Sequence, residues 1–269
     1  MATKKQTKYK SAEQVRTAVG RQYHIGVAPG EVETSILMVG DPERARRTAT
    51  RLEKITGQWA HREFVTISGV WQGMPVTILA TGIGCDNTEI ALVELTTLVK
   101  NATVIRAGTC GGLQDSLAIG DLVVTWGAVR LERTSLEYVP EGYPAVADPE
   151  VALALRASAK RLGYPFRFGM TATASGFYAA QGRSSPPFIA RRPQLTQELA
   201  QVGVLNLEME TSTLLTLASL CGYRAGAVCT VFASRTRNEF VAPELKREYE
   251  DRAVLTALDA LKSLAEQRL

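Results

Sequence analysis

Histidine and cysteine are scarce in this sequence of 269 residues. It has two histidines and four cysteines, Cys85, Cys110, Cys221 and Cys229, and no two cysteines form a C-x-x-C pair. Because structural zinc sites are built from these side chains at close spacing, such a small and scattered set argues against one. The spacing gives no sign of a disulfide framework either, and we expect reduced thiols.

Long apolar runs are missing too. Those present are of strand length, which is too short to cross a bilayer. The N-terminus carries lysines with no apolar stretch behind them, unlike a secretory leader. The formal net charge is only +4, and no basic block is interleaved with aromatics as in a nucleic-acid groove. We therefore expect a cytoplasmic protein that spans no membrane and binds no nucleic acid.

The length and composition are typical of one large α/β domain, with 45% hydrophobic and 22% charged residues. Residues 1–20 are polar and lack a period, so we expect a flexible N-terminal segment followed by one domain over 21–269. The apolar patterns then alternate between two kinds. They predict strands over 35–39, 64–71, 75–80, 103–105, 121–126, 169–174, 204–207 and 226–233, and helices over 43–52, 87–99, 149–162, 211–220 and 244–264. Gly40-Asp41-Pro42 predicts a turn after the first strand, and Gln72-Gly73-Met74 predicts a hairpin between the second and the third.

The stretch 103–112 reads T-V-I-R-A-G-T-C-G-G and changes character at Arg106. A β-branched strand is expected to end there and to open into a loop of small residues. The glycines would let backbone N–H groups approach a ligand, Thr109 offers a hydroxyl, and Arg106 offers a planar fork of donors suited to phosphate. This favours an anion cradle. The alternative is a tight glycine turn in which Arg106 pairs with a carboxylate.

Further arginines stand at predicted strand ends. Gly40 and Arg44 flank a predicted strand-to-helix junction, where free N–H groups and the helix dipole favour an anion. Arg62 precedes the strand over 64–71, and Arg235 follows the last strand.

The loop after residue 174 carries Phe177, Gln181 and Arg183 close together. An aromatic ring can stack on a flat heterocycle while an amide and a guanidinium meet its edge. An ordinary surface loop with a solvated arginine is the alternative. Three prolines within 184–193 indicate a lid or an irregular excursion.

Two carboxylates, Glu208 and Glu210, precede the helix expected over 211–220. They could complement the helix dipole, or one could turn inward to accept hydrogen bonds from a sugar's hydroxyls. The strand, Gly-x-Gly turn and helix at 75–99 do not predict a dinucleotide site, because the third glycine and the following acidic residue are missing.

Five motifs together resemble the nucleoside phosphorylase family, and within it most closely the uridine-cleaving members. They are G-D-P-E-R at 40–44, H-R-E-F at 61–64, R-A-G-T-C-G-G at 106–112, F-Y-A-A-Q-G-R at 177–183 and L-E-M-E-T at 207–211. The resemblance runs from Tyr23 to the end of the chain. It implies a single-domain three-layer α/β/α fold with a central mixed sheet.

The implied activity is that of a pentosyltransferase in nucleoside salvage, which reversibly converts uridine and phosphate into uracil and ribose 1-phosphate without a cofactor. The implied assembly is a hexamer built as a trimer of dimers, with active sites shared across each dimer. A purine nucleoside phosphorylase, a hydrolytic nucleosidase and a non-catalytic nucleoside-binding protein remain alternatives.

The resemblance also assigns roles to residues. Phosphate would be bound by Gly40, Arg44, Arg106 and Thr109, with Arg62 from the neighbouring subunit. Ribose would be held by Met209, Glu210 and Thr109, with His24 from that neighbour. The base would meet Phe177, Gln181, Arg183 and Arg235. Catalysis would depend on Arg106, Glu210, Gln181, Arg183 and Arg235.

Three departures from the family pattern stand out. The region 184–206 is shorter than in the bacterial uridine enzymes, and Leu207 stands where a tyrosine is common. Some relatives hold a potassium ion with a glutamate matching Glu63, the carbonyl of Ile83 and a serine. Here Asn87 replaces that serine.

Overall fold

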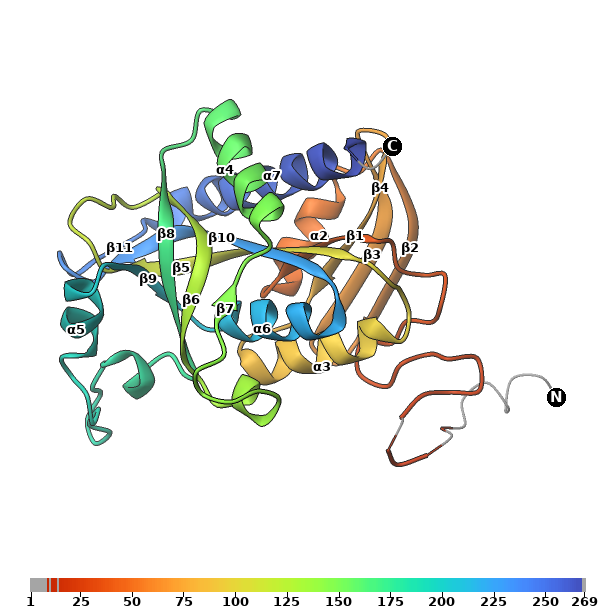
Figure 1. Ribbon diagram of the computed structural model, residues 1–269. Helices are drawn as coiled ribbons and strands as arrows, with labels where there is room; N and C mark the ends of the chain where they lie inside the picture. The colour runs from red at the N-terminus through yellow and green to blue at the C-terminus, as the bar shows by residue number, and fades with distance from the viewer. Residues whose placement is uncertain (1–8, 10, 14, 268–269) are drawn as a thin grey trace.

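The computed structural model describes Tyr9, residues 11–13 and residues 15–267, which form one mixed sheet between two layers of helices (Figure 1). On one face lie α2 (Pro42–Ala49), α4 (Pro149–Arg161) and α7 (Lys246–Glu266). On the other lie α3 (Cys85–Thr96) and α6 (Thr211–Cys221), and α5 (Leu195–Gln201) stands at one end. The expected three-layer α/β/α architecture is confirmed.

The described residues contribute eleven strands to the sheet. They are β1 (Ser35–Val39), β2 (Lys54–His61), β3 (Phe64–Trp71), β4 (Met74–Ala80), β5 (Thr103–Gly112), β6 (Leu122–Leu131), β7 (Ala145–Val146), β8 (Phe166–Ala174), β9 (Val204–Glu208), β10 (Arg224–Ser234) and β11 (Glu239–Phe240). The sequence patterns missed β2, because most of its residues are exposed and no apolar alternation marks it.

The side chains of strand β1 alternate between the two helix layers. Ile36 and Met38 pack with the core beneath α3 and α6, whereas Leu37 and Val39 pack with the core beneath α4 and α7. Successive side chains of a strand point to opposite faces, so a continuous apolar run is what a strand covered on both sides requires. Parallel pairing of β1 with β4 and β5, and of β5 with β10, brings the carboxyl ends of these strands to one edge.

Five strands close into a ring. β10 pairs with both β5 and β6, β8 pairs with β6 and β9, and β9 returns to β5. The ring holds β5, β8, β9 and β10 in one continuous wall, and their ends carry most of the motifs that the sequence singled out.

The prediction of a loop after Arg106 is wrong, because β5 continues as a strand to Gly112. Gly111 and Gly112 pair with β9, and Gly108 pairs with β10. A Cβ atom at Gly108 would lie 3.1 Å from the Cys229 sulfur, and one at Gly111 would lie 3.3 Å from Cγ of Arg235. The glycines therefore allow close packing beside a strand instead of forming a turn.

Two predicted junctions are confirmed. Gln72 and Gly73 connect β3 to β4 with φ values of 46° and 80°, the left-handed pair that a two-residue hairpin favours. At the start of α2, the Asp41 side chain accepts a hydrogen bond from the Glu43 backbone N–H, and Pro42 takes the first helical position.

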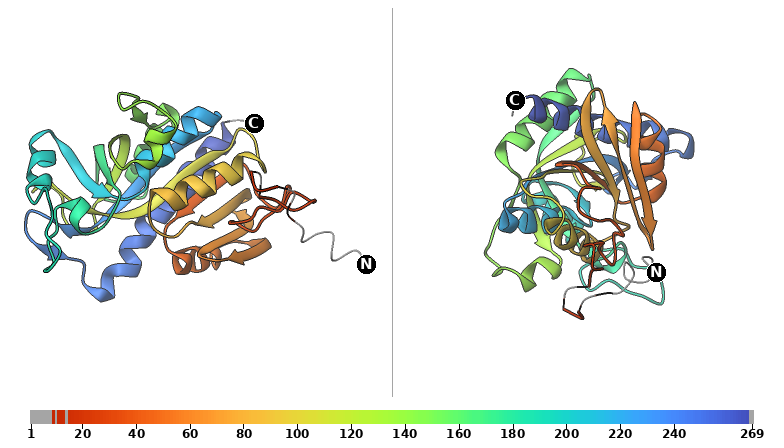
Figure 2. Two further views of the ribbon diagram at one scale, coloured as in Figure 1. Left: turned by 90° about the horizontal axis from the view of Figure 1, so that it is seen from below. Right: turned by 90° about the vertical axis from the view of Figure 1, so that its right-hand side faces the viewer.

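Residues 1–8, 10 and 14 of the expected N-terminal segment lie outside the described residues. The described part forms isolated bridges between Tyr9 and Thr17 and between Arg16 and Gln22. It lies at the opposite end of the molecule from α5 (Figures 1 and 2). None of the helices described is both long and apolar enough to cross a membrane.

Candidate active site

A cavity of about 740 Å³ opens where β1, β4 and β5 end. Among the residues that the sequence singled out, it is lined by Gly40, Arg44, Glu63, Ile83, Asn87, Arg106, Thr109, Phe177, Gln181, Arg183, Leu207, Glu208, Met209 and Glu210. The fold thus gathers all five motifs around one hollow. Phe232 and Phe240 add apolar wall that the motifs did not predict.

Arg44 lies in the first turn of α2 and is only 6% exposed. Its Nη2 donates to Glu250 Oε1 at 3.0 Å, and its Nη1 donates to the carbonyl of Ala107 at 3.3 Å. The third nitrogen, Nε, is buried without a hydrogen-bond partner. Because buried donors are nearly always satisfied, this N–H marks a place where an acceptor is missing.

Arg106 is 4% exposed and lies between two carboxylates. Nη2 donates to Glu210 Oε2, and Nε donates to Glu208 Oε2 at 3.5 Å. The carboxylate pairing weighed as the alternative is therefore present, yet Arg106 also lines the cavity and its buried Nη1 has no partner. Burial alone lowers the pKa of Arg106, but Glu210 and Glu208 outweigh it and raise that pKa, so the group stays cationic.

Glu210 sits immediately before α6 and is buried. Its Oε1 accepts the Gly84 N–H at 2.7 Å, at the N-terminus of α3, and its Oε2 accepts from Arg106. Burial raises the pKa of Glu210, while Arg106 and the Gly84 N–H act against that rise. The carboxylate is thus held at the cavity wall by a cation and by a helix N-terminus.

Glu208 has a different environment. Its carboxylate accepts from the backbone N–H of Glu210 and of Thr211, both at 2.9 Å, and from Thr173 Oγ1 at 2.5 Å. Glu208 therefore accepts hydrogen bonds from backbone N–H groups at the start of α6. This matches the alternative, considered from the sequence, that a carboxylate here complements the helix N-terminus. Of the two carboxylates, Glu210 is the one with fewer protein donors.

At the other end of the cavity, Arg183 Nη1 donates to Gln181 Oε1 and to the Phe177 carbonyl, each at 2.6 Å. The Arg183 guanidinium lies 4.0 Å from the centre of the Phe177 ring, so Arg183 covers one face of that ring. Arg235 donates to the Gln181 carbonyl with two nitrogens, each at 3.2 Å, and stands behind the lining residues. Burial and then Arg235 lower the pKa of Arg183 to about 10.

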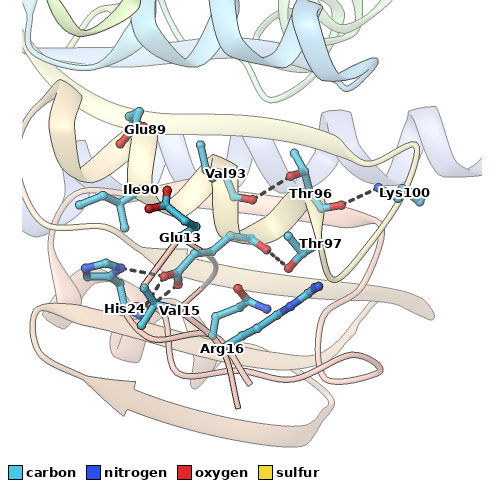
Figure 3. Close-up of a pocket in the computed structure, with 12 residues that line it drawn as sticks. Glu13, Val15, Arg16, His24, Glu89, Ile90, Val93, Thr96, Thr97 and Lys100 are labelled. Atoms are coloured by element: carbon cyan, nitrogen blue, oxygen red, sulfur yellow. Dashed lines mark hydrogen bonds and ion pairs between the residues drawn. The ribbon is translucent and has the colours of Figure 1, made fainter. Parts of the chain in front are cut away.

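His24 and Arg62 do not line this cavity. His24 borders a second hollow of about 700 Å³ between the N-terminal segment and α3 (Figure 3), where its Nδ1 lies 2.7 Å from Glu94 Oε1. Arg62 Nη2 donates to the Tyr23 hydroxyl at 2.9 Å. Both side chains therefore lie apart from the cavity of their own chain.

The residues matched to the potassium site, Glu63, Ile83 and Asn87, all line the cavity. Asn87 Nδ2 lies 3.4 Å from the Ile83 carbonyl oxygen and donates to it. Within the described part of the chain, no cluster of three or more histidine, cysteine, aspartate or glutamate side chains could hold a metal ion. A potassium ion near Glu63 and Ile83 stays a prediction.

The sequence did not predict two carboxylates that bind predicted site residues. Glu94 contacts His24, and Glu250 contacts Arg44. Both lie on helices whose pattern indicates only packing and solvent faces. An acidic residue on a helix is common, and its partners, 70 and 206 positions away, carry no local signal.

Comparison with known proteins adds independent evidence. The sequence model of the phosphorylase superfamily matches residues 34–266. Uridine phosphorylase of Thermococcus kodakarensis is 43% identical over 96% of this chain and 92% of its own. Uridine phosphorylase of Klebsiella aerogenes is 36% identical over 90% of this chain and 97% of its own.

A solved structure agrees. The Trypanosoma brucei nucleoside phosphorylase, described as showing uridine phosphorylase activity, has a TM-score of 0.86 with 27% identity over 91% of this chain and 98% of its own. The cavity, its buried arginines and these matches lead to one conclusion: the chain belongs to the phosphorylase superfamily.

Proposed function

We propose that this enzyme catalyses the reversible phosphorolysis of uridine to uracil and ribose 1-phosphate. The observation that carries the proposal is the pair Arg44 and Arg106, two buried guanidinium groups on one cavity that each retain an N–H without an acceptor. The relatives named above bear the same activity in their names.

Phosphate supplies the missing acceptors. Its oxygens would accept from Arg44 and Arg106, with the Gly40 backbone and the Thr109 hydroxyl beside them. Charge-assisted hydrogen bonds contribute ~1.5–3 kcal/mol each, which offsets part of the cost of taking the dianion out of water.

Ribose would lie between the phosphate and the base. Glu210 accepts hydrogen bonds from the 2′ and 3′ hydroxyls, and Met209 packs against the sugar. As the glycosidic bond breaks, positive charge develops on the ribose, and the bound phosphate both stabilises that charge and captures C1′. The electron pair of the C1′–N1 bond leaves with uracil, and a phosphate oxygen forms the new bond to C1′.

The base end must stabilise negative charge on departing uracil. Arg183 and Gln181 would meet its edge, Phe177 lines that end, and Arg235 supports Gln181 through the carbonyl that it contacts. A cation placed before the reaction begins lowers the barrier without reorganisation during the bond cleavage.

We propose further that two copies of the chain complete each site. His24 and Arg62 lie apart from the cavity of their own chain, and Arg62 would reach the phosphate and His24 the 5′ hydroxyl of the neighbour's nucleoside. The assembly that we propose is a hexamer built as a trimer of such dimers.

One assay tests the reaction. The purified protein is incubated with uridine, with and without inorganic phosphate, and the release of uracil is measured. Inosine serves as the matched purine substrate. We expect uracil release that requires phosphate and exceeds base release from inosine. Faster release from inosine would identify a purine enzyme, release without phosphate a nucleosidase, and binding without release a storage protein; each would overturn the proposal.

A further inference from the structure

Glu250 lies on α7, contacts Arg44 and is not itself part of the cavity lining. One carboxylate oxygen accepts Arg44 Nη2 at 3.0 Å, and the other accepts Arg47 Nη2 at 2.5 Å. The side chains of Arg44 and Glu250 are 8% and 13% exposed. The bridge is therefore well shielded from water, which makes it stronger than a surface ion pair.

The charge state of Glu250 follows from its neighbours. Burial raises the pKa of Glu250, but Arg44 and Arg47 outweigh burial and lower that pKa below its ordinary value. The group is thus a carboxylate at neutral pH, and it can accept from both arginines at once.

The helix that carries Glu250 packs against β10 and β5. The Thr230 hydroxyl on β10 donates to the carbonyl of Tyr249 at 2.7 Å, one residue before Glu250. Helix α7 also packs against β5, which carries Arg106. These contacts fix the Glu250 carboxylate relative to both arginines of the cavity.

We propose that Glu250 is a positioning residue for phosphate, a role that rests on the proposed function of the cavity. It holds one nitrogen of Arg44 while the Ala107 carbonyl holds a second, so the long side chain keeps one conformation at the cavity wall and its Nε–H is left without a partner. Phosphate then binds without having to order Arg44.

The same carboxylate could act in the opposite way, because a negative charge near a dianion repels it. The two effects differ in sign. If repulsion dominates, removing the charge of Glu250 lowers the KM for phosphate. If positioning dominates, the KM for phosphate rises.

The test uses Glu250→Gln and, in case that variant folds poorly, Glu250→Asp, which keeps the charge on a shorter stem. We expect Glu250→Gln to raise the KM for phosphate about 10-fold, as for loss of a hydrogen bond to a charged group, and to leave the KM for uridine within about twofold. Glu250→Asp should give a smaller rise. A second readout, the phosphate-dependent increase in Tm, should shrink in parallel.

Asp251→Asn is the matched control. It removes the same charge from the next residue, which pairs with Arg51 and Arg47 but not with Arg44. We expect wild-type KM values for phosphate and uridine in this variant. A rise in the phosphate KM equal to that of Glu250→Gln would show a general charge effect and would overturn the positioning role.

Other outcomes are equally decisive. An unchanged or lowered phosphate KM in a folded Glu250→Gln protein overturns the positioning role, and so does a parallel rise in the KM for uridine. A wild-type protein that is stabilised by phosphate but cleaves no nucleoside contradicts the proposed function alone, because the Tm readout still tests Glu250. A wild-type protein that phosphate does not stabilise and that cleaves nothing overturns both.

Discussion

Arg106 and Glu210 form a buried ion pair in the wall of the cavity, so the group assigned to phosphate and the group assigned to ribose neutralise each other in this structure. Each also keeps capacity for a ligand. Arg106 has a partnerless Nη1, and Glu210 accepts from one backbone N–H besides Arg106. The pair therefore couples the two halves of the site before any substrate is bound.

Arg106→Ala should destabilise the fold as well as remove the phosphate contact. The substitution leaves Glu208 and Glu210 buried without their shared cation, and breaking a buried pair costs ~3–5 kcal/mol. Urea unfolding measures the change. Arg46→Ala is the control, because Arg46 is exposed and pairs with the exposed Glu43, and it should change stability by less than ~1 kcal/mol. Equal stabilities of the two variants would contradict the prediction.

Arg183→Ala should lower the turnover of uridine by ~100-fold or more, since one preorganised donor to a developing anion is lost. Steady-state kinetics of the purified variant provide the measurement. Arg192→Ala removes a nearby arginine that is exposed and pairs with Glu198, and it should keep wild-type turnover. Wild-type turnover in Arg183→Ala would remove Arg183 from the reaction.

Mixed assemblies test whether sites are shared between chains. Arg62→Ala and Arg106→Ala proteins should each be inactive, because each lacks an arginine of every phosphate site. Unfolding and refolding them together should restore activity, since some sites then combine an intact Arg62 with an intact Arg106. Reassembled mixtures that contain both chains and stay inactive would tell against sharing.

The contribution of Glu250 to stability should depend on pH. Its pKa is lowered in the folded state, so the folded protein binds fewer protons than the unfolded chain. The stability lost in Glu250→Gln should be full at neutral pH. It should shrink as the pH falls below ~4.3, the ordinary pKa at which the unfolded chain takes up the proton, and then through the lower pKa of the folded state. Denaturation at several pH values measures it. A difference between the two proteins that stays constant down to ~pH 3 would contradict the assignment.

Local signals predicted those parts of the fold that depend on local chemistry. The Gly-Asp-Pro sequence after β1 specified both the end of the strand and the cap of α2, and Gln72 with Gly73 specified the hairpin. The course of β5 beyond Arg106 could not be read in this way, because glycine is frequent in loops and only pairing with β9 and β10 makes it strand.

The same distinction between local and long-range signals applies to the candidate site. Arg44, in the helix turn that follows β1, and Arg106, on β5, could be predicted because the carboxyl ends of parallel strands lie together. Their partners could not, since Glu250 stands 206 positions from Arg44 and Glu210 stands 104 from Arg106. Phe232 and Phe240 also resemble ordinary core or surface residues until the fold places them beside the cavity.

The closure of β5, β6, β8, β9 and β10 into a ring has a practical meaning for anyone who wishes to redesign this protein for bulkier substrates. A wall whose strands are all paired cannot spread to admit a larger molecule, so extra room has to come from trimming side chains. Leu207, Phe232 and Phe240 are apolar positions on the cavity where shortening a side chain would enlarge the space without cutting a backbone hydrogen bond.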